Sequence, residues 1–197
     1  MKKFVIATML TVLLCTLAFA KIVKRNGDAP GEKKTGIKGM YCVYSKDWFF
    51  GTPALPGWDF VEEDGSGDFN AYYCYPGKIY TSSPAIIYIR VMNKKGLNMK
   101  AALEQDMKEF SVQVSDAAYH AYPEGKNKRF VTASMIYTYR DRADFLTFLD
   151  PGKKYKFYLI FCLAGASKYT QGFESYFREL VSGFVAVGTR DELVLKP

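Results

Sequence analysis

Residues 155–184 read YKFYLIFCLAGASKYTQGFESYFRELVSGF, and this stretch decides the fold. Its first ten residues, Tyr155 to Ala164, carry one charge and are rich in aromatic and branched side chains, which is typical of a central strand covered on both faces. After the small residues 164–167, apolar side chains recur at steps of three and four, as on one stripe of a helix: Phe173, Tyr176, Phe177, Leu180, Val181 and Phe184. A buried strand that leads into an amphipathic helix indicates a sheet with helices laid on it.

The first twenty residues have the three parts of a secretory signal peptide. Lys2 and Lys3 form the positive start, residues 4–17 form an apolar core, and Ala18-Phe19-Ala20 supplies small residues before a predicted cleavage at Ala20/Lys21. An uncleaved membrane anchor is the alternative, but the apolar run is shorter than the ~20 residues that cross a bilayer. We therefore expect a periplasmic or secreted protein.

Residues 21–39 predict a flexible basic leader, because they hold four glycines and a proline without hydrophobic periodicity. Such a leader is either a solvated tail or a tether that makes weak membrane-surface contact with anionic headgroups or binds an acidic partner. Eight of the 27 basic residues and two of the 20 acidic residues precede Met40, so the remaining chain is nearly neutral. A neutral body argues against a nucleic-acid partner, which requires a clustered basic face.

The chain from residue 40 to residue 187 has the length of one domain, followed by a loosely attached tail at 188–197. Ala85 to Met92 is a second buried-strand pattern, and Asn98 caps a helix whose apolar stripe is Met99, Leu103, Met107, Phe110 and Val114. Residues 115–129 form a polar connection that contains the lone His120, a surface histidine by its setting. Strands at 131–140 and 145–149 then lead through the turn Asp150-Pro151-Gly152 into the strand at Tyr155, as antiparallel neighbours.

The order of strands, helix, strands and helix predicts an α+β fold, a twisted and largely antiparallel sheet with two main helices packed on it. Several segments resemble the PsbP-like and DcrB-like family of exported proteins: FFGTPALPGW, AIIYIRVM, LNMKAALEQDMKEF, FLTFLDPGKKYKFYLIF and ESYFRELVSGF. The resemblance covers residues 40–187 and implies a PsbP-like sandwich. Members of this fold are generally non-enzymatic and dock to other proteins, and no metal or cofactor residue of the family is matched here.

The three cysteines of the predicted mature chain have different settings. Cys162 lies within the buried-strand pattern and is interpreted as an inert apolar thiol. Cys42 and Cys74 lie in two tyrosine-rich strand patterns, and a disulfide between them is one of two open alternatives in an exported protein.

Recognised catalytic motifs are missing from the sequence, which has no GxSxG, HExxH, CxxC or GxxxxGK pattern and one histidine. Residues 64–70 alternate oxygen-bearing side chains as a calcium loop does, but Phe69 stands where glycine is required, so a hairpin turn is predicted. We expect no enzyme activity, no catalytic residues, no metal site and no cofactor. The third hypothesis is an enzyme that uses a reactive Cys162 or an acidic pair such as Asp141 and Asp144.

Tyrosine is unusually frequent, with 15 residues in the chain, and several lie beside turns. Tyr72, Tyr73, Tyr75 and Tyr80 are either a sheet-surface ladder or an interaction surface, because tyrosine has an apolar face and a polar tip. The leading hypothesis is an exported accessory module that docks to an envelope protein or complex. The alternative is a periplasmic carrier that holds a small apolar ligand between the sheet and helices, using Met99, Met107 and Phe110.

Overall fold

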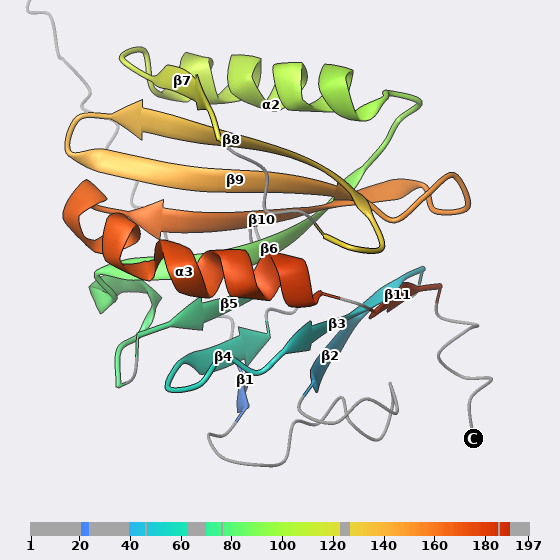
Figure 1. Cartoon of the computed structure of the whole chain (residues 1–197), viewed down its shortest axis with the longest axis horizontal. Coiled ribbons are helices and arrows are strands. Elements are labelled where there is room, and N and C mark those ends of the chain that lie inside the picture. Colours follow the sequence, from blue (N-terminus) through green and yellow to red (C-terminus); the bar gives the residue numbers. More distant parts are fainter. Residues whose placement is uncertain are drawn as a thin grey trace, which may run out of the picture.

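The computed structural model describes residues 21–23, 40–45, 47–62, 70–75, 77–122, 127–184 and 186–189. These residues form two antiparallel sheets and two main helices (Figure 1), so the predicted α+β class is confirmed. The predicted signal peptide lies outside the described residues, as do residues 24–39, 63–69 and 190–197. No helix in the described part of the chain has the length and apolar character needed to cross a membrane.

The larger sheet has eight strands within the described residues, and every neighbouring pair is antiparallel. Across the sheet the strands are β1 (Lys21–Val23), β4 (Asp59–Glu62), β5 (Ala71–Cys74), β6 (Ala85–Asn93), β10 (Phe157–Gly165), β9 (Arg142–Asp150), β8 (Val131–Tyr139) and β7 (Ala118–Ala121). The predicted antiparallel run of β8, β9 and β10 is confirmed by their pairing.

Strand β10 lies at the centre of this sheet and is buried along its whole length, as its apolar sequence predicts. Successive side chains alternate between the faces. Phe157, Leu159, Phe161 and Leu163 enter one core, and Tyr158, Ile160, Cys162 and Ala164 enter the other. The sheet therefore separates two apolar layers.

The first layer is covered by helix α3 (Ser167–Gly183) and by a three-stranded sheet of β2 (Met40–Tyr44), β3 (Phe49–Pro53) and β11 (Ala186–Gly188). Phe177, Leu180 and Val181 of α3 are buried in this layer. The contacts that join the sheets include the Tyr41 ring, which stacks on Phe60 at 4.2 Å, and the Tyr73 hydroxyl, which donates to the Pro53 carbonyl at 2.7 Å.

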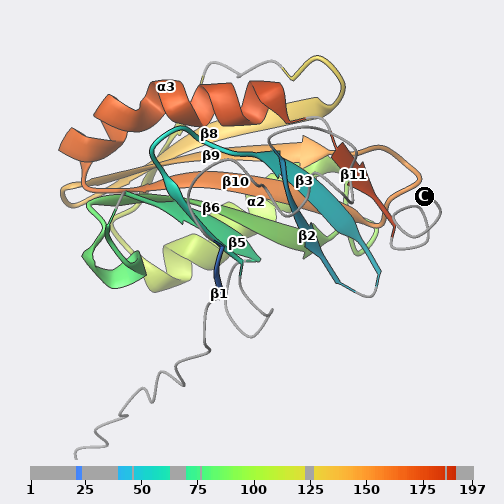
Figure 2. The same ribbon diagram turned by 90° about the horizontal axis from the view of Figure 1, so that it is seen from below.

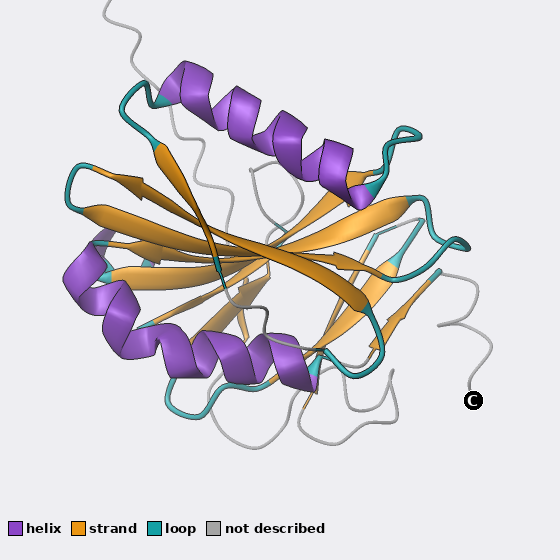
Figure 3. Cartoon of the chain, turned by 45° about the horizontal axis from the view of Figure 1, so that its top comes forward, coloured by secondary structure: helices purple, strands orange, loops and turns teal. Residues whose placement is uncertain are grey.

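The second layer lies under helix α2 (Met99–Gln113), on the opposite side of the large sheet from α3 (Figures 2 and 3). Asn98 caps α2 as predicted, since its side-chain oxygen accepts the Ala101 N–H at 2.9 Å. Only Ala102 and Asp106 are fully buried along this helix. The predicted stripe residues Met99, Leu103, Met107 and Phe110 are partly buried against the core.

Three short edge strands differ from the sequence expectations. Lys21–Val23, within the predicted flexible leader, forms β1 and pairs with β4. Ala118–Ala121, within the predicted polar connection, forms β7. Ala186–Gly188 pairs with β3, so ordered structure continues past the predicted boundary at residue 187. Strands of three or four residues at an edge need no hydrophobic alternation, because pairing on one side is enough to hold them.

Candidate functional site

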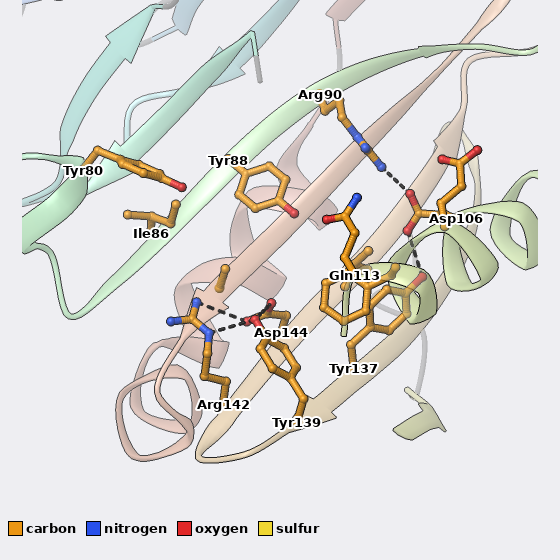
Figure 4. A pocket seen from close by; sticks show the side chains of 14 residues that line it. Tyr80, Ile86, Tyr88, Arg90, Asp106, Gln113, Tyr137, Tyr139, Arg142 and Asp144 are labelled. Atoms are coloured by element: carbon orange, nitrogen blue, oxygen red, sulfur yellow. Dashed lines mark hydrogen bonds and ion pairs between the residues drawn. The ribbon is translucent and has the colours of Figure 1, made fainter. Parts of the chain in front are cut away.

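A polar pocket of about 320 Å³ lies between α2 and the sheet face opposite α3. Strands β6, β8, β9 and β10 contribute to it, while α2 and the 3₁₀ helix η1 (Tyr80–Ser82) form its sides (Figure 4). Its most prominent side chains are two arginines, two aspartates and four tyrosines, namely Arg90, Arg142, Asp106, Asp144, Tyr80, Tyr88, Tyr137 and Tyr139. We call this cavity the α2 pocket.

The first charged group in the α2 pocket centres on Asp106. Its Oδ1 accepts a hydrogen bond from Nη2 of Arg90 on β6, and its Oδ2 accepts the Tyr137 hydroxyl of β8 at 2.9 Å. Asp106 is 8% exposed, so this carboxylate links the helix to the sheet within the layer under α2. The Nε of Arg90 is buried and has no hydrogen-bond partner among the described residues.

The second charged group centres on Asp144 of β9. Its Oδ2 accepts the Tyr139 hydroxyl at 2.8 Å, and its Oδ1 accepts the Gly165 N–H at 3.2 Å. Arg142 donates from Nε to the Tyr139 oxygen at 2.8 Å, and its Nη2 lies 3.8 Å from Asp144 Oδ1. Burial raises the pKa of the Asp144 carboxyl above its ordinary value, although these three donors oppose the shift.

Cys42 and Cys74, the pair considered for a disulfide, lie on strands of different sheets. Cys42 is on β2 between Tyr41 and Val43, which both enter the core under α3, whereas Cys74 of β5 packs in the layer under α2. The Cys74 thiol donates to the Lys78 carbonyl at 3.2 Å. All three described cysteines are thiols in this structure, and a disulfide between Cys42 and Cys74 in the exported protein stays one of two alternatives. Cys162 is completely buried, and burial raises its pKa well above the ordinary value.

The proposed tyrosine surface separates into two buried and two exposed residues. Tyr72 and Tyr73 belong to the two cores and are 6% and 0% exposed, so neither can form an interaction surface. Strand β5 is covered on both faces, and the position of these tyrosines beside a turn does not predict that burial. Tyr75 and Tyr80, beyond the end of β5, are 43% and 44% exposed.

The three residues predicted to hold an apolar ligand, Met99, Met107 and Phe110, do not line one cavity. Phe110 lines the α2 pocket, but Met99 and Met107 pack into the core under α2 instead of lining it. The pocket is also rich in charge and hydroxyl groups, unlike the apolar cavity expected for this carrier. Sequence reasoning passed over Asp106, although it lies three residues after Leu103 and four before Phe110, on the predicted core stripe. A carboxylate on the apolar stripe of a helix and Arg90 in a buried-strand pattern were the sequence features that could have indicated a buried ion pair.

A second feature is a group of touching rings at the surface near the start of α3, formed by Trp58, Tyr75, Phe173 and Tyr176. The Trp58 ring centre lies 5.0 Å from Phe173, 6.1 Å from Tyr176 and 6.4 Å from Tyr75. Trp58 is 7% exposed, whereas Tyr176 is 38% exposed despite its place on the predicted core stripe of α3. We call these four residues the aromatic patch.

His120 and Asp141, which were also considered from the sequence, lie within hydrogen-bond distance of other residues of the fold. His120 is exposed on β7, and its Nε2 lies 3.0 Å from the Thr138 hydroxyl. Asp141 accepts the Ser167 N–H through its backbone carbonyl. Among the described residues, no group of three or more histidine, cysteine, aspartate or glutamate side chains could hold a metal ion. The calcium-like segment falls almost entirely outside the described residues.

The described residues form an α+β domain with one helix on each face of an antiparallel sheet, which agrees with the predicted sheet with two helices packed on it. Among solved structures, the chain is similar to the solution structure of cyanobacterial PsbP (CyanoP) from Synechocystis sp. PCC 6803. The TM-score is 0.49 and the identity 13%, over 83% of this chain and 98% of that one. No protein-family model and no curated protein sequence matches the chain. No residue role is transferred from this distant likeness.

Proposed function

We propose that the protein is an exported, non-enzymatic accessory module that docks to an envelope protein or complex through the aromatic patch. The observation that carries this proposal is the exposure of Tyr75 and Tyr176 around a buried tryptophan. Ile79 lies four residues beyond Tyr75 and is a further exposed apolar side chain, at 63%. Tyrosine and tryptophan are enriched where proteins bind one another, and scattered single apolar residues do not form such a group.

The aromatic patch is built from three separate segments, which gives it a fixed shape before any partner binds. Trp58 precedes β4, Tyr75 follows β5, and Phe173 and Tyr176 lie on successive turns of α3. The Tyr75 ring is also 5.8 Å from Phe173, so each exposed ring packs against a less exposed one. Rings that are held in place lose little conformational entropy on binding, and this favours docking.

A non-enzymatic role is supported by the state of the reactive side chains. The Cys162 thiol is buried with a raised pKa, which disfavours the thiolate nucleophile. The two carboxylates of the α2 pocket accept hydrogen bonds from tyrosines and contact arginines of the same chain. These groups hold the fold together and are not poised as a nucleophile and base.

Export is supported by the signal-peptide pattern, whose predicted cleavage point lies directly before β1. Cleavage there keeps every described strand in the mature chain. The basic residues of the leader, at positions 21–39, support weak contact with an anionic membrane surface or an acidic partner. The nearly neutral body continues to disfavour nucleic acid as a partner.

The proposal is tested by site-specific photo-crosslinking in the cells that make the protein. A photoreactive phenylalanine analogue replaces Tyr176 in one variant and Val112 in a matched control, because Val112 is 83% exposed on α2. We expect one dominant crosslinked species from position 176, little from position 112, and a mass that shows a chain beginning at Lys21.

A second variant shows whether the rings themselves bind. Tyr75→Ala, made in the chain that carries the photoreactive residue at position 176, leaves Trp58 in place and removes the neighbouring exposed ring, so the crosslinked species should fall by about tenfold or more. Equal crosslinking from positions 112 and 176, or no effect of Tyr75→Ala, would contradict the docking proposal. A chain that retains residues 1–20 would contradict the export by cleavage.

A further inference from the structure

The hydrogen bonds of the α2 pocket leave donors without matching acceptors. Asp106 accepts from Arg90 and Tyr137, and Asp144 accepts from Tyr139 and Gly165 and lies near Arg142. Both carboxylates are therefore occupied by groups of the same chain. An arginine side chain carries five N–H donors and no acceptor, so each guanidinium has further donor capacity.

Arg90 shows this excess most clearly. Its Nη2 is bonded to Asp106, while its buried Nε has no hydrogen-bond partner within the described residues. The Arg90 side chain as a whole is 34% exposed and lines the cavity, so its remaining N–H groups have room for an acceptor from outside the chain. Figure 4 shows Arg90 and Arg142 on different sides of the pocket, with the Tyr88 ring and Gln113 between them.

The walls between the two arginines are largely aromatic. Tyr80, Tyr88 and Phe110 line the pocket together with Ile86, and Tyr80 packs edge-on against Tyr72 at 5.6 Å. Flat ring walls favour a flat ligand, which stacks or makes edge contacts with them. A pocket of about 320 Å³ is at the small end of ligand cavities and suits one or two rings.

The charges of the lining limit the charge of the ligand. Arg90 and Arg142 are balanced by Asp106 and Asp144, and Glu109 adds one negative charge at the rim. Glu109 is exposed and its Oε1 accepts the Gln105 amide at 2.7 Å. A carboxylate is therefore favoured by hydrogen bonds to the guanidinium donors and not by the net charge of the lining, and a second negative charge on the ligand would add repulsion.

We propose that the α2 pocket binds a small aromatic carboxylic acid as its monoanion, with the carboxylate on the Arg90 guanidinium and the ring between Tyr80, Tyr88 and Phe110. The inference uses residues outside the aromatic patch and is measured on the isolated protein. Loss of docking and loss of ligand binding are therefore separate results.

The first test compares acids with neutral molecules of the same shape. Benzoate and 2-naphthoate are titrated into the purified protein by calorimetry and by NMR, alongside benzamide and 2-naphthamide. We expect the acids to bind about tenfold or more tightly than the amides, because a charge-assisted hydrogen bond is lost in the amide. Equal binding of acid and amide, tighter binding of benzamidine, or inorganic phosphate binding as well as benzoate would overturn the proposal.

The second test removes the Arg90 guanidinium without changing the net charge of the pocket. The double variant Arg90→Gln with Asp106→Asn should weaken 2-naphthoate binding by about tenfold or more. Arg178→Gln is the matched control, because Arg178 also pairs with a carboxylate, Glu174, at 2.7 Å but lies on α3 across the sheet. We expect wild-type affinity in this control. Unchanged binding in the double variant would overturn the assignment of Arg90.

A third variant keeps the proposal testable if the double variant unfolds. Tyr80 is 44% exposed at the side of the pocket, so Tyr80→Ala is tolerated by the core. Loss of this ring wall should weaken 2-naphthoate about threefold to tenfold and benzoate less, because the larger ring system makes more contact. No change for either acid would show that the ligand does not lie in this pocket.

Discussion

At the scale of single residues, Asp106 has the largest structural consequence for α2. The helix buries only Ala102 and Asp106 fully, so its attachment to the sheet depends on the bonds of this carboxylate to Arg90 and Tyr137 as well as on apolar contact. A charge pair inside a protein adds little net stability, but removal of one partner leaves the other charge without compensation.

Asp106→Ala should therefore lower the free energy of unfolding by about 2–3 kcal/mol, because the Arg90 guanidinium and the Tyr137 hydroxyl both lose their acceptor. Urea unfolding followed by circular dichroism measures the change. Glu104→Ala is the control on the same helix, since Glu104 forms an exposed pair with Lys100 at 3.9 Å and should change stability by about 0.5 kcal/mol or less. Equal effects of the two substitutions would refute the role given to Asp106.

The sequence predicted the burial of single residues correctly where the apolar character of the local segment was enough to decide it. The length and apolar character of the segment around Cys162 predicted its burial, which is complete. Tyr72 and Tyr73 were assigned wrongly, because their position beside a turn says nothing about coverage of both faces of β5. The pocket residues come from six elements spread along the chain, and only the tertiary structure brings them together.

At the scale of elements, the junction between β10 and α3 is closely packed at Gly165. Gly165 ends β10 and pairs with Ala85 of β6. A Cβ atom at Gly165 would lie 2.7 Å from the Pro84 carbonyl oxygen and 3.0 Å from the Ala85 Cα. Both neighbours are backbone atoms of the adjacent strand, so they cannot rotate away as a side chain can.

Gly165→Ala should accordingly lower the free energy of unfolding by about 1–3 kcal/mol through overpacking. The opposite result is expected at Gly172 on α3, where nothing lies within 4 Å of an added Cβ. Gly172→Ala should stabilise by about 0.5–1 kcal/mol, because alanine is the better helix former. Thermal or urea unfolding of both variants checks the pair, and a destabilisation shared by both would contradict the steric argument.

The long elements were predictable, and the short ones were not. Strand β10 has nine residues and helix α3 has seventeen, and the clear apolar pattern of each predicted the element that the structure contains. Strands β1, β7 and β11 have three or four residues and depend on a neighbour that the local sequence does not specify. Tyr176 belongs to the predicted apolar stripe of α3 but is exposed, because the stripe is wider than the part of the helix that the sheet covers.

At the scale of the whole molecule, hydroxyl groups of tyrosine are buried in both cores. Burial raises the pKa of several tyrosines above the ordinary value of about 10. These residues are Tyr41, Tyr73, Tyr88, Tyr122, Tyr137, Tyr139 and Tyr158. In the folded protein they remain protonated at pH values where an unfolded chain would release their protons.

Stability should therefore be constant with respect to these groups below about pH 10 and should fall as the pH rises further. Each such tyrosine contributes a slope of about 1.4 kcal/mol per pH unit in the range where only the unfolded state has lost its proton. The appearance of tyrosinate absorbance on alkaline titration measures this, with a denatured sample as the reference. If native and denatured protein titrated with the same midpoint, the hydroxyls would have to be solvated and the predicted loss of stability would not occur.

The sequence supports the α+β class and the hairpin order of β8, β9 and β10, but it does not specify which strand lies on the other side of β10. That partner is β6, which is connected to β10 through a helix and three strands. Hairpins follow from local turns, whereas a long-range pairing depends on the summed burial of both faces.

The central pairing of β6 with β10 has a consequence for the time course of folding. Strands β4, β5 and β6 can pair among themselves as soon as they leave the ribosome or a translocation channel, but the outer edge of β6 stays open until Gly165 has emerged. An open apolar edge invites pairing with other chains. A nascent chain that stops before Phe157 therefore exposes the unpaired edge of β6, and the pairing of β10 with β6 late in synthesis closes this edge to other chains.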